Sequence, residues 1–271
     1  MNFITHLQTF AESDDIGVYG LDLDALGDDA GFFEAVLSPT ERVEISRLVQ
    51  EQQRRRVTVS RGALRMIVGA KLEVPATTVA LVRDACGRPR VSIGGSGRMD
   101  GPHVSCSRSG RYAVVAVAKQ YPLGIDIEVV TDDRFPERIA ELILSPSECV
   151  GHALMPPGDR TQWLARVWVR KEALLKGMGC GLEIDPRSIT AAAWLEDVFH
   201  ATSPRTCHRM SALPPWYLHE FAWGPSVIAL ATRGADAQLR FMKFDVCEPQ
   251  RLWSADAVSM GFDDILVAGH V

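Results

Sequence analysis

Two short segments of the chain carry carboxylates and a lysine at spacings that can bring them together. In the first, a predicted strand, Asp126 and Glu128 are two positions apart and therefore point to the same face of the strand. In the second, a predicted helix, Glu172 and Lys176 are four positions apart and share one side of the helix. Carboxylate oxygens suit Mg²⁺ or Mn²⁺, and a lysine can take up further phosphate charge. The combination predicts a divalent cation that holds a pyrophosphate.

Each segment taken alone also has an ordinary explanation. Two acidic side chains on a strand, Asp126 and Glu128, can form a solvated face. Glu172 and Lys176 can form an ion pair on a helix surface, which contributes roughly a few tenths of a kcal/mol. The order of the two segments and the residues that flank them favour the cation site over these alternatives.

Lys171 is harder to explain as a surface residue. The helix predicted over residues 159–178 has an apolar stripe made of Leu164, Val167, Leu174, Leu175 and Met178. Lys171 falls inside this stripe, where a lysine must extend its charge to solvent or meet an anion. Glu172 lies beside the stripe rather than opposite it.

A second predicted helix, over residues 54–69, shows a similar feature. Its apolar stripe consists of Val59, Ala63, Met66, Ile67 and Ala70. Arg56 falls among these residues, and an inward-pointing arginine suggests a buried carboxylate or a phosphate. An internal salt bridge and a phosphate site therefore both remain open for Arg56.

Two predicted turns offer further groups that can bind anions. One, at residues 83–89, contains Gly87 and Arg88, and the other ends a hairpin with Ser107 and Arg108. Backbone amides, hydroxyls and a guanidinium group at such places can hold a phosphate. A solvated turn is the alternative in both cases.

No set of residues for covalent catalysis is recognisable. The 7 histidines are dispersed, and the chain has no GxSxG motif and no P-loop lysine. The 6 cysteines show no CxxC spacing, so neither a zinc site nor a disulfide framework is expected. Reduced thiols are typical of a cytoplasmic protein.

Composition narrows the remaining classes of function. Of the 271 residues, 46% are hydrophobic and 23% are charged, which is typical of a folded chain with a packed core. The net charge of −5 argues against nucleic-acid binding through bulk charge. Neither a membrane-spanning apolar run nor a signal peptide is apparent. We expect a cytoplasmic protein that binds neither nucleic acid nor membrane.

The pattern Leu-Ser-Pro-x-Glu occurs twice, at residues 37–41 and 144–148, each time ahead of a long predicted helix. Serine as the N-cap, proline at the first helical position and glutamate three residues after the cap form a capping box. The repetition suggests two similar α/β halves that meet near residue 122. We expect an N-terminal half over residues 1–122 and a C-terminal half over residues 123–271. The C-terminal half carries the metal site and ends in a peripheral extension.

Taken in order, five segments resemble the motifs of the 4′-phosphopantetheinyl transferases of the larger type, named for the activator of surfactin synthetase. That family has a basic helix, a G-K-P turn, an S-H-S-G segment, G-[IV]-D-x-E and W-x-x-K-E-x-x-x-K. The matching segments here are residues 56–65, 87–89, 107–110, 124–128 and 168–176. The last two together are highly specific, whereas the first three are weak singly.

The resemblance implies an α+β monomer with two similar α/β halves related by a pseudo-twofold axis and coenzyme A in the cleft between them. It implies that Asp126, Glu128 and Glu172 bind Mg²⁺ or Mn²⁺ and that Lys176 binds the pyrophosphate, with Lys171 nearby. The positions that would hold the adenosine 3′-phosphate and neighbouring groups of coenzyme A are Arg56, Arg83, Gly87, Arg88, Ser107 and Arg108.

The implied reaction transfers the 4′-phosphopantetheine arm of coenzyme A to a serine of an apo acyl or peptidyl carrier protein and releases 3′,5′-ADP. Such carriers serve fatty acid, polyketide and nonribosomal peptide synthesis. Glu172 is the expected general base, with Glu128 as the second choice. We expect the carrier to contact residues 131–160, which contain several apolar side chains.

Three residues depart from the family pattern. Arg108 stands in place of the histidine, Arg88 in place of the turn lysine, and Val169 in place of a small hydroxyl residue. None of these removes a metal ligand, so we expect activity to survive. Two other hypotheses are a non-catalytic module that binds coenzyme A or a carrier and a Mg²⁺-dependent hydrolase of nucleotide pyrophosphates. The intact acidic triad argues against the first, and the lack of a further water-activating acid cluster argues against the second.

Overall fold

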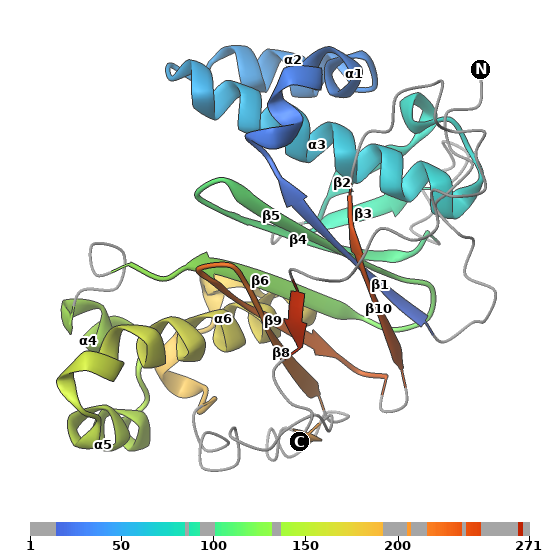
Figure 1. Cartoon of the computed structure of the whole chain (residues 1–271). Helices are drawn as coiled ribbons and strands as arrows, with labels where there is room; N and C mark the ends of the chain where they lie inside the picture. Colours follow the sequence, from blue (N-terminus) through green and yellow to red (C-terminus); the bar gives the residue numbers. More distant parts are fainter. Residues whose placement is uncertain are drawn as a thin grey trace.

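The computed structural model describes residues 15–84, 87–92, 101–131, 137–191, 205–206, 216–234, 237–244 and 265–267. The fold is α+β: two sheets pack face to face, and helices lie against their outer faces (Figure 1). No helix in these ranges is both long and apolar enough to cross a membrane.

The N-terminal half begins with strand β1 (Asp15–Asp22) and continues through three helices before its remaining strands. The helices are α1 (Ala30–Ala35), α2 (Pro39–Ser46) and α3 (Glu51–Leu72). The strands are β2 (Ala80–Arg83), β3 (Pro89–Ser92), β4 (His103–Ser109) and β5 (Tyr112–Ala118). β1 pairs antiparallel with β5, and β5 pairs antiparallel with β4, while β2 and β3 form a separate ribbon.

The C-terminal half begins with strand β6 (Leu123–Val129) and follows the same plan. Its helices are α4 (Ala140–Ile143), α5 (Pro146–Leu154) and α6 (Arg160–Met178). Its strands are β7 (Arg205–Thr206), β8 (Tyr217–Trp223) and β9 (Ser226–Thr232). β6 pairs antiparallel with β9, and β9 pairs antiparallel with β8.

The two halves therefore share one pairing pattern. In the N-terminal half β1 pairs with β5 and β5 with β4; in the C-terminal half β6 pairs with β9 and β9 with β8. Three α-helices follow β1, and three follow β6. Both expected capping boxes form, with the Ser38 hydroxyl accepting from the Glu41 amide and the Ser145 hydroxyl accepting from the Glu148 amide. The repeated sequence pattern thus marks two similar α/β units.

The chain crosses back to the first half near its end. Strand β10 (Gln238–Lys243) pairs parallel with β1, and strand β11 (Ile265–Val267) pairs antiparallel with β8. A division of the chain at residue 122 therefore leaves out one strand of the N-terminal sheet. β10 covers the edge of β1, whose backbone groups would otherwise lack strand partners on that side.

Strand β6 lies where the two halves meet. Ile125 and Ile127 are fully buried in the core between the sheets, together with residues of β1 and β5. Because neighbouring strand residues point to opposite faces, Asp126 and Glu128 face away from this core. The predicted alternation along the strand is confirmed, and it directs Asp126 toward α6.

Candidate functional site

Asp126 lies at the centre of the candidate site and is almost fully buried. Its Oδ1 accepts hydrogen bonds from Lys176 Nζ at 2.5 Å and from Ser107 Oγ at 2.6 Å. Lys176 Nζ also donates to Ser107 Oγ at 3.0 Å. Asp126 Oδ2 is buried and accepts no hydrogen bond from the residues that the structure describes. One buried carboxylate oxygen of the site is therefore left for a ligand.

Glu172 faces the same region from helix α6. Burial raises the pKa of Glu172, and the negative charges of Asp126 and Glu128 raise it further, while Lys176 acts in the opposite direction. Burial disfavours the charged form of Lys176, but the charge and hydrogen bond of Asp126 outweigh this and raise its pKa. The three acids and the lysine thus share one electrostatic environment.

The carboxylate oxygens of Asp126, Glu128 and Glu172 suit a hard divalent cation, although the three groups do not surround a common point. Over the described ranges, no three His, Cys, Asp or Glu side chains surround a common point suitable for a metal ion. The Lys176 ammonium instead lies against Asp126. Oxygen donors with net negative charge, one of them a buried oxygen without a hydrogen bond, are the chemistry that Mg²⁺ and Mn²⁺ require.

Lys171 does not belong to this group, which corrects the expectation that it lies near the pyrophosphate. Its side chain is 0% exposed and forms an ion pair with Glu148. Its Nζ also donates to the carbonyl oxygens of Ile143, at 2.5 Å, and Pro186, at 3.0 Å. The anion predicted beside Lys171 is therefore a carboxylate of the protein, and the three donors of the ammonium are all used.

Arg56 is also occupied by the protein. Its Nε and Nη2 donate to the two carboxylate oxygens of Asp24, at 2.7 and 2.6 Å. Of the two alternatives left open for Arg56, the structure shows the salt bridge, and the side chain is half-buried rather than inside the apolar core. Arg56 thus pairs with Asp24 in the described structure, and its contact with coenzyme A stays a prediction.

The turn that carries Arg88 reaches from the N-terminal half to the end of α6. Gly87 adopts φ +80, a conformation that favours glycine, and its carbonyl accepts from Arg83 Nη1 at 2.8 Å. Arg88 Nε donates to Asp84 Oδ2 and Nη1 donates to the Gly177 carbonyl, both at 3.1 Å. A cation at the carbonyl end of a helix is favourable. Arg88 thus links the N-terminal half to the C-terminal half through Gly177, the residue that follows Lys176 on α6.

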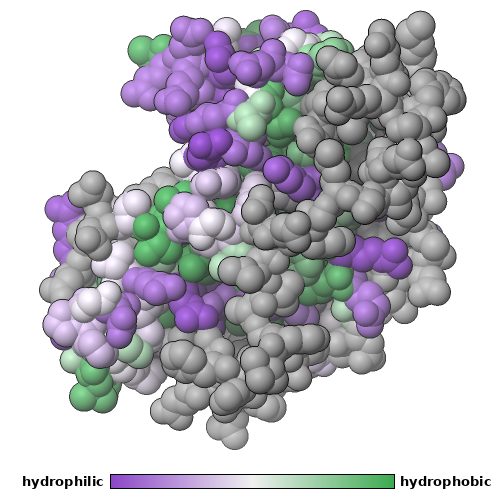
Figure 2. Space-filling model, viewed as in Figure 1, coloured by the Kyte–Doolittle hydropathy of each residue, from purple (hydrophilic) through white to green (hydrophobic). Residues whose placement is uncertain are grey.

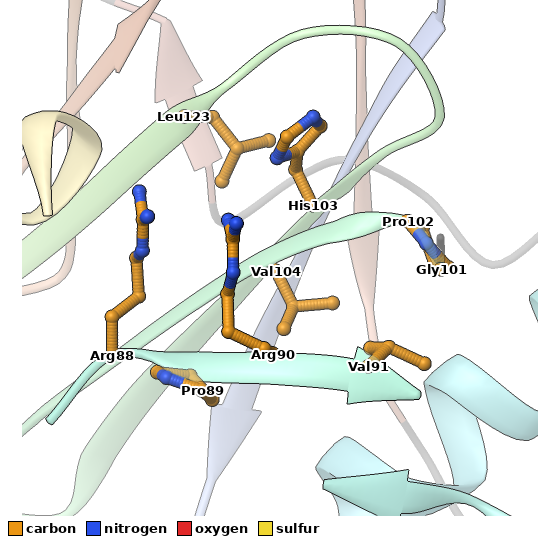
Figure 3. Close-up of a pocket in the computed structure, with 9 residues that line it drawn as sticks. All are labelled: Arg88, Pro89, Arg90, Val91, Gly101, Pro102, His103, Val104 and Leu123. Atoms are coloured by element: carbon orange, nitrogen blue, oxygen red, sulfur yellow. The ribbon is translucent and has the colours of Figure 1, made fainter. Parts of the chain in front are cut away.

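Arg90 and His103 lie beside Arg88 and are basic residues that the sequence did not indicate as part of the site. Arg88 and Arg90 extend side by side toward His103 and Leu123, around a cavity of about 20 Å³ (Figure 3). Burial, followed by the charges of Arg90 and Arg88, lowers the pKa of His103. The signal in the sequence was the spacing of two between Arg88, which precedes β3, and Arg90 on β3, because side chains two positions apart in an extended segment share a face.

Ser107 and Arg108 point in different directions because they are neighbours on β4. Ser107 belongs to the Asp126 site, whereas Arg108 lies near Arg61 and Arg83. Arg108 is exposed as a residue, yet partial burial of its guanidinium and the charges of Arg61 and Arg83 lower its pKa. Figure 2 shows a recess between the two halves at the left of the molecule. The turn that joins β4 and β5 points toward the same side in Figure 1.

Two family models match the chain. One, described as the 4′-phosphopantetheinyl transferase superfamily, matches residues 122–231, and the other, described as 4′-phosphopantetheinyl transferase, N-terminal, matches residues 28–120. The two matches fall on the two halves of the fold. They meet between residues 120 and 122, ahead of strand β6.

Three curated proteins are similar to the chain. The 4′-phosphopantetheinyl transferase HetI of Nostoc sp. is 28% identical over 233 residues, which cover 86% of this chain and 93% of HetI. The 4′-phosphopantetheinyl transferase Sfp of Bacillus subtilis is 22% identical over 152 residues, or 56% of this chain and 64% of Sfp. The L-aminoadipate-semialdehyde dehydrogenase-phosphopantetheinyl transferase of Pongo abelii is 27% identical over 155 residues, or 54% of this chain and 49% of that protein. The chain belongs to the 4′-phosphopantetheinyl transferase superfamily and is a transferase.

Proposed function

We propose that the protein transfers the 4′-phosphopantetheine arm of coenzyme A to a serine hydroxyl of an apo acyl or peptidyl carrier protein and releases 3′,5′-ADP. The observation that carries this proposal is the meeting of Asp126, Glu172 and Lys176 at the junction of the two halves. The family to which the chain belongs supports the same reaction.

Asp126, Glu128 and Glu172 are the residues that would hold a divalent cation, Mg²⁺ or Mn²⁺. When bound, such a cation neutralises part of the pyrophosphate charge of coenzyme A. The buried, unbonded Oδ2 of Asp126 supports this assignment.

Lys176 and Glu172 supply the remaining chemistry of the transfer. Lys176 Nζ, held at Asp126 in the free protein, is placed to donate to the pyrophosphate and to stabilise charge on the departing 3′,5′-ADP. The carrier serine oxygen forms a bond to the β-phosphorus, and the bond from that phosphorus to the bridging oxygen breaks. Glu172, whose carboxylate faces Asp126 and Lys176 from α6, is the proposed base that accepts the serine proton.

The basic residues of the N-terminal half would bind the adenosine end of coenzyme A. Arg83, Arg88 and Arg108 keep this role from the sequence, and Arg90 adds a charge beside Arg88. Gly87 allows the turn that presents Arg88. The positive charge of these residues suits the phosphate groups of coenzyme A.

The test is to incubate the protein with coenzyme A, Mg²⁺ and an apo carrier protein and to weigh the carrier by mass spectrometry. A gain of one phosphopantetheine is expected, with a loss of about 10²-fold or more in rate for Asp126→Asn. Glu34→Gln, an exposed carboxylate on α1, serves as the control and should react like the unmodified protein. Full activity of Asp126→Asn would refute the site. Cleavage of coenzyme A without transfer would indicate a hydrolase, and binding without any reaction would indicate a non-catalytic module.

A further inference from the structure

Strand β4 presents a row of three serines to strand β6. Ser105, Ser107 and Ser109 are two positions apart, so their hydroxyls share one face of β4. Ser105 and Ser109 are 3% and 1% exposed, which places both in the interior of the junction between the halves.

Ser109 connects the N-terminal half to Glu128. Its Oγ accepts a hydrogen bond from the Val129 amide at 2.9 Å and donates one to Glu128 Oε2 at 2.6 Å. A serine hydroxyl has one proton, and an amide can only donate, so the direction of both bonds is fixed. Ser109 therefore donates its one hydrogen bond to the Glu128 carboxylate and accepts one from the adjacent backbone amide of Val129.

Ser107 and Ser105 differ from Ser109 in their hydrogen-bond partners. Ser107 accepts a hydrogen bond from Lys176 Nζ at 3.0 Å and donates one to Asp126 Oδ1 at 2.6 Å. Ser105 accepts from the Ile125 amide at 3.0 Å. Ser105 thus joins the same strands as Ser109 through a backbone group of β6.

We propose that Ser109 is a positioning residue that aims the Glu128 carboxylate and thereby sets the affinity of the protein for its divalent cation. The inference rests on the proposed function, in which Glu128 is a metal ligand. All three acidic ligands come from the C-terminal half, yet the hydroxyl that fixes one of them comes from the N-terminal half. The metal site is then complete only when the two halves are joined.

The physical reason is preorganisation. A glutamate side chain has several rotatable bonds, and a carboxylate that must be ordered when the metal arrives loses binding free energy to that ordering. A buried hydroxyl that donates to the carboxylate at 2.6 Å fixes its orientation beforehand. Outer partners of metal ligands typically change metal affinity by about 10- to 100-fold.

The experiment measures Mn²⁺ binding to the full chain by electron paramagnetic resonance, without coenzyme A or carrier. Ser109→Ala is expected to weaken Mn²⁺ binding by about tenfold or more. Ser105→Ala removes a hydrogen bond between the same strands that does not involve a carboxylate, and its Mn²⁺ affinity should stay within about twofold of the wild-type value. Ser109→Thr keeps the hydroxyl and should retain most of the Mn²⁺ affinity. Unchanged affinity of Ser109→Ala, or an equal loss in Ser105→Ala, would overturn the proposal.

A double-mutant cycle guards against a general loss of structure. If Ser109 acts through Glu128, adding Ser109→Ala to Glu128→Gln should change Mn²⁺ affinity by less than about twofold. A full further loss would show that Ser109 acts elsewhere and would overturn the inference. A wild-type protein that transfers phosphopantetheine but binds no Mn²⁺ would also overturn it, while leaving the transferase function intact. Failure of the carrier assay alone would contradict only the proposed function.

Discussion

Two buried cations, Arg65 and Lys171, hold matching places in the two halves. Arg65 Nε donates to Glu41, the glutamate of the first capping box, at 2.7 Å, and Lys171 pairs with Glu148, the glutamate of the second. Each cation also donates to backbone carbonyls that follow its own long helix, such as those of Val79 and Pro186. Lys171 therefore ties α5 and α6 together, as Arg65 ties α2 and α3.

This role predicts that Lys171→Met affects folding rather than chemistry. Glu148 would keep its backbone donors but lose its cationic partner in the interior, so the free energy of unfolding should fall by about 3–5 kcal/mol. Urea denaturation measures this change. Arg65→Met, in the half without the acidic residues, is the matched control and should be destabilised in the same direction. A Lys171→Met protein with normal stability and a much lower kcat would show that Lys171 takes part in the reaction.

His219, on strand β8, predicts a dependence of stability on pH. Its Nε2 is buried and has no hydrogen-bond partner within the described ranges, and burial lowers its pKa to about 4. Between this value and the ordinary pKa of about 6.5, the unfolded chain binds a proton that the folded protein does not. The free energy of unfolding should therefore fall by about 1–3 kcal/mol as the pH is lowered through this interval.

Urea denaturation at pH 7.5 and pH 4.5 tests this effect, with His219→Gln as the comparison because its side chain does not titrate. The variant should lose less stability than the wild-type protein between the two pH values. An equal loss in both proteins would assign the pH dependence to other groups.

At the scale of the elements, the glycine that opens the Gly124–Glu128 segment allows β6 to approach α6. A Cβ atom at Gly124 would lie 2.1 Å from the Ala173 carbonyl oxygen and 2.3 Å from the Gly177 amide nitrogen. Both atoms belong to the backbone of α6 and cannot move aside as a flexible side chain can. The close approach brings Asp126 on the strand within reach of Lys176 on the helix.

Gly124→Ala is therefore expected to separate β6 from α6 and to reduce both stability and transfer. Strain of this kind destabilises by roughly 1–3 kcal/mol or more, which thermal or urea unfolding measures. Gly31→Ala is the control, because α1 leaves open space around Gly31 and alanine favours a helix. If Gly124→Ala unfolds at the same urea concentration as the wild-type protein, the close contact is not needed.

Elements governed by local signals were predictable from the sequence, and contacts between distant residues were not. The alternation around Asp126 and the capping residues at Ser38 and Ser145 act within a few positions, so the β6 strand and the starts of α2 and α5 were found. Lys171 was correctly placed in an apolar stripe, but its partner, Glu148, lies on another helix.

Longer-range pairing was missed for the same reason. Strand β10 pairs with β1 at the other end of the described chain, and nothing in the local pattern of residues 238–243 shows this partner.

At the scale of the whole molecule, the two similar halves differ in what they carry at equivalent places. On α6, Glu172 and Lys176 stand one and five positions after Lys171. On α3, the positions one and five after Arg65 are Met66 and Ala70. The C-terminal half thus supplies the acids and the lysine. The N-terminal half supplies the serines of β4 and the basic groups, so the proposed reaction would draw on both halves although only one carries the proposed metal ligands.

The carrier protein is expected to dock on the corner formed by α4 and α5, within the segment proposed from the sequence. Leu142, Val150 and Leu154 are exposed there, with Leu154 81% exposed. Figure 2 shows an apolar area at its lower left, over this corner. Such exposed side chains are candidates for a protein interface when they lie together.

Leu154→Glu should raise the KM for the carrier by about tenfold and leave the KM for coenzyme A unchanged. The substitution removes apolar area from the proposed contact and adds a charge that must be desolvated when the carrier binds. Steady-state kinetics with each substrate varied in turn separate the two constants. Val49→Glu is the control, because Val49 is 91% exposed in the other half and its change should alter neither constant. Equal kinetics for Leu154→Glu and the wild-type protein would place the carrier on another surface, and a parallel rise for Val49→Glu would show that added charge, rather than a specific contact, sets the affinity.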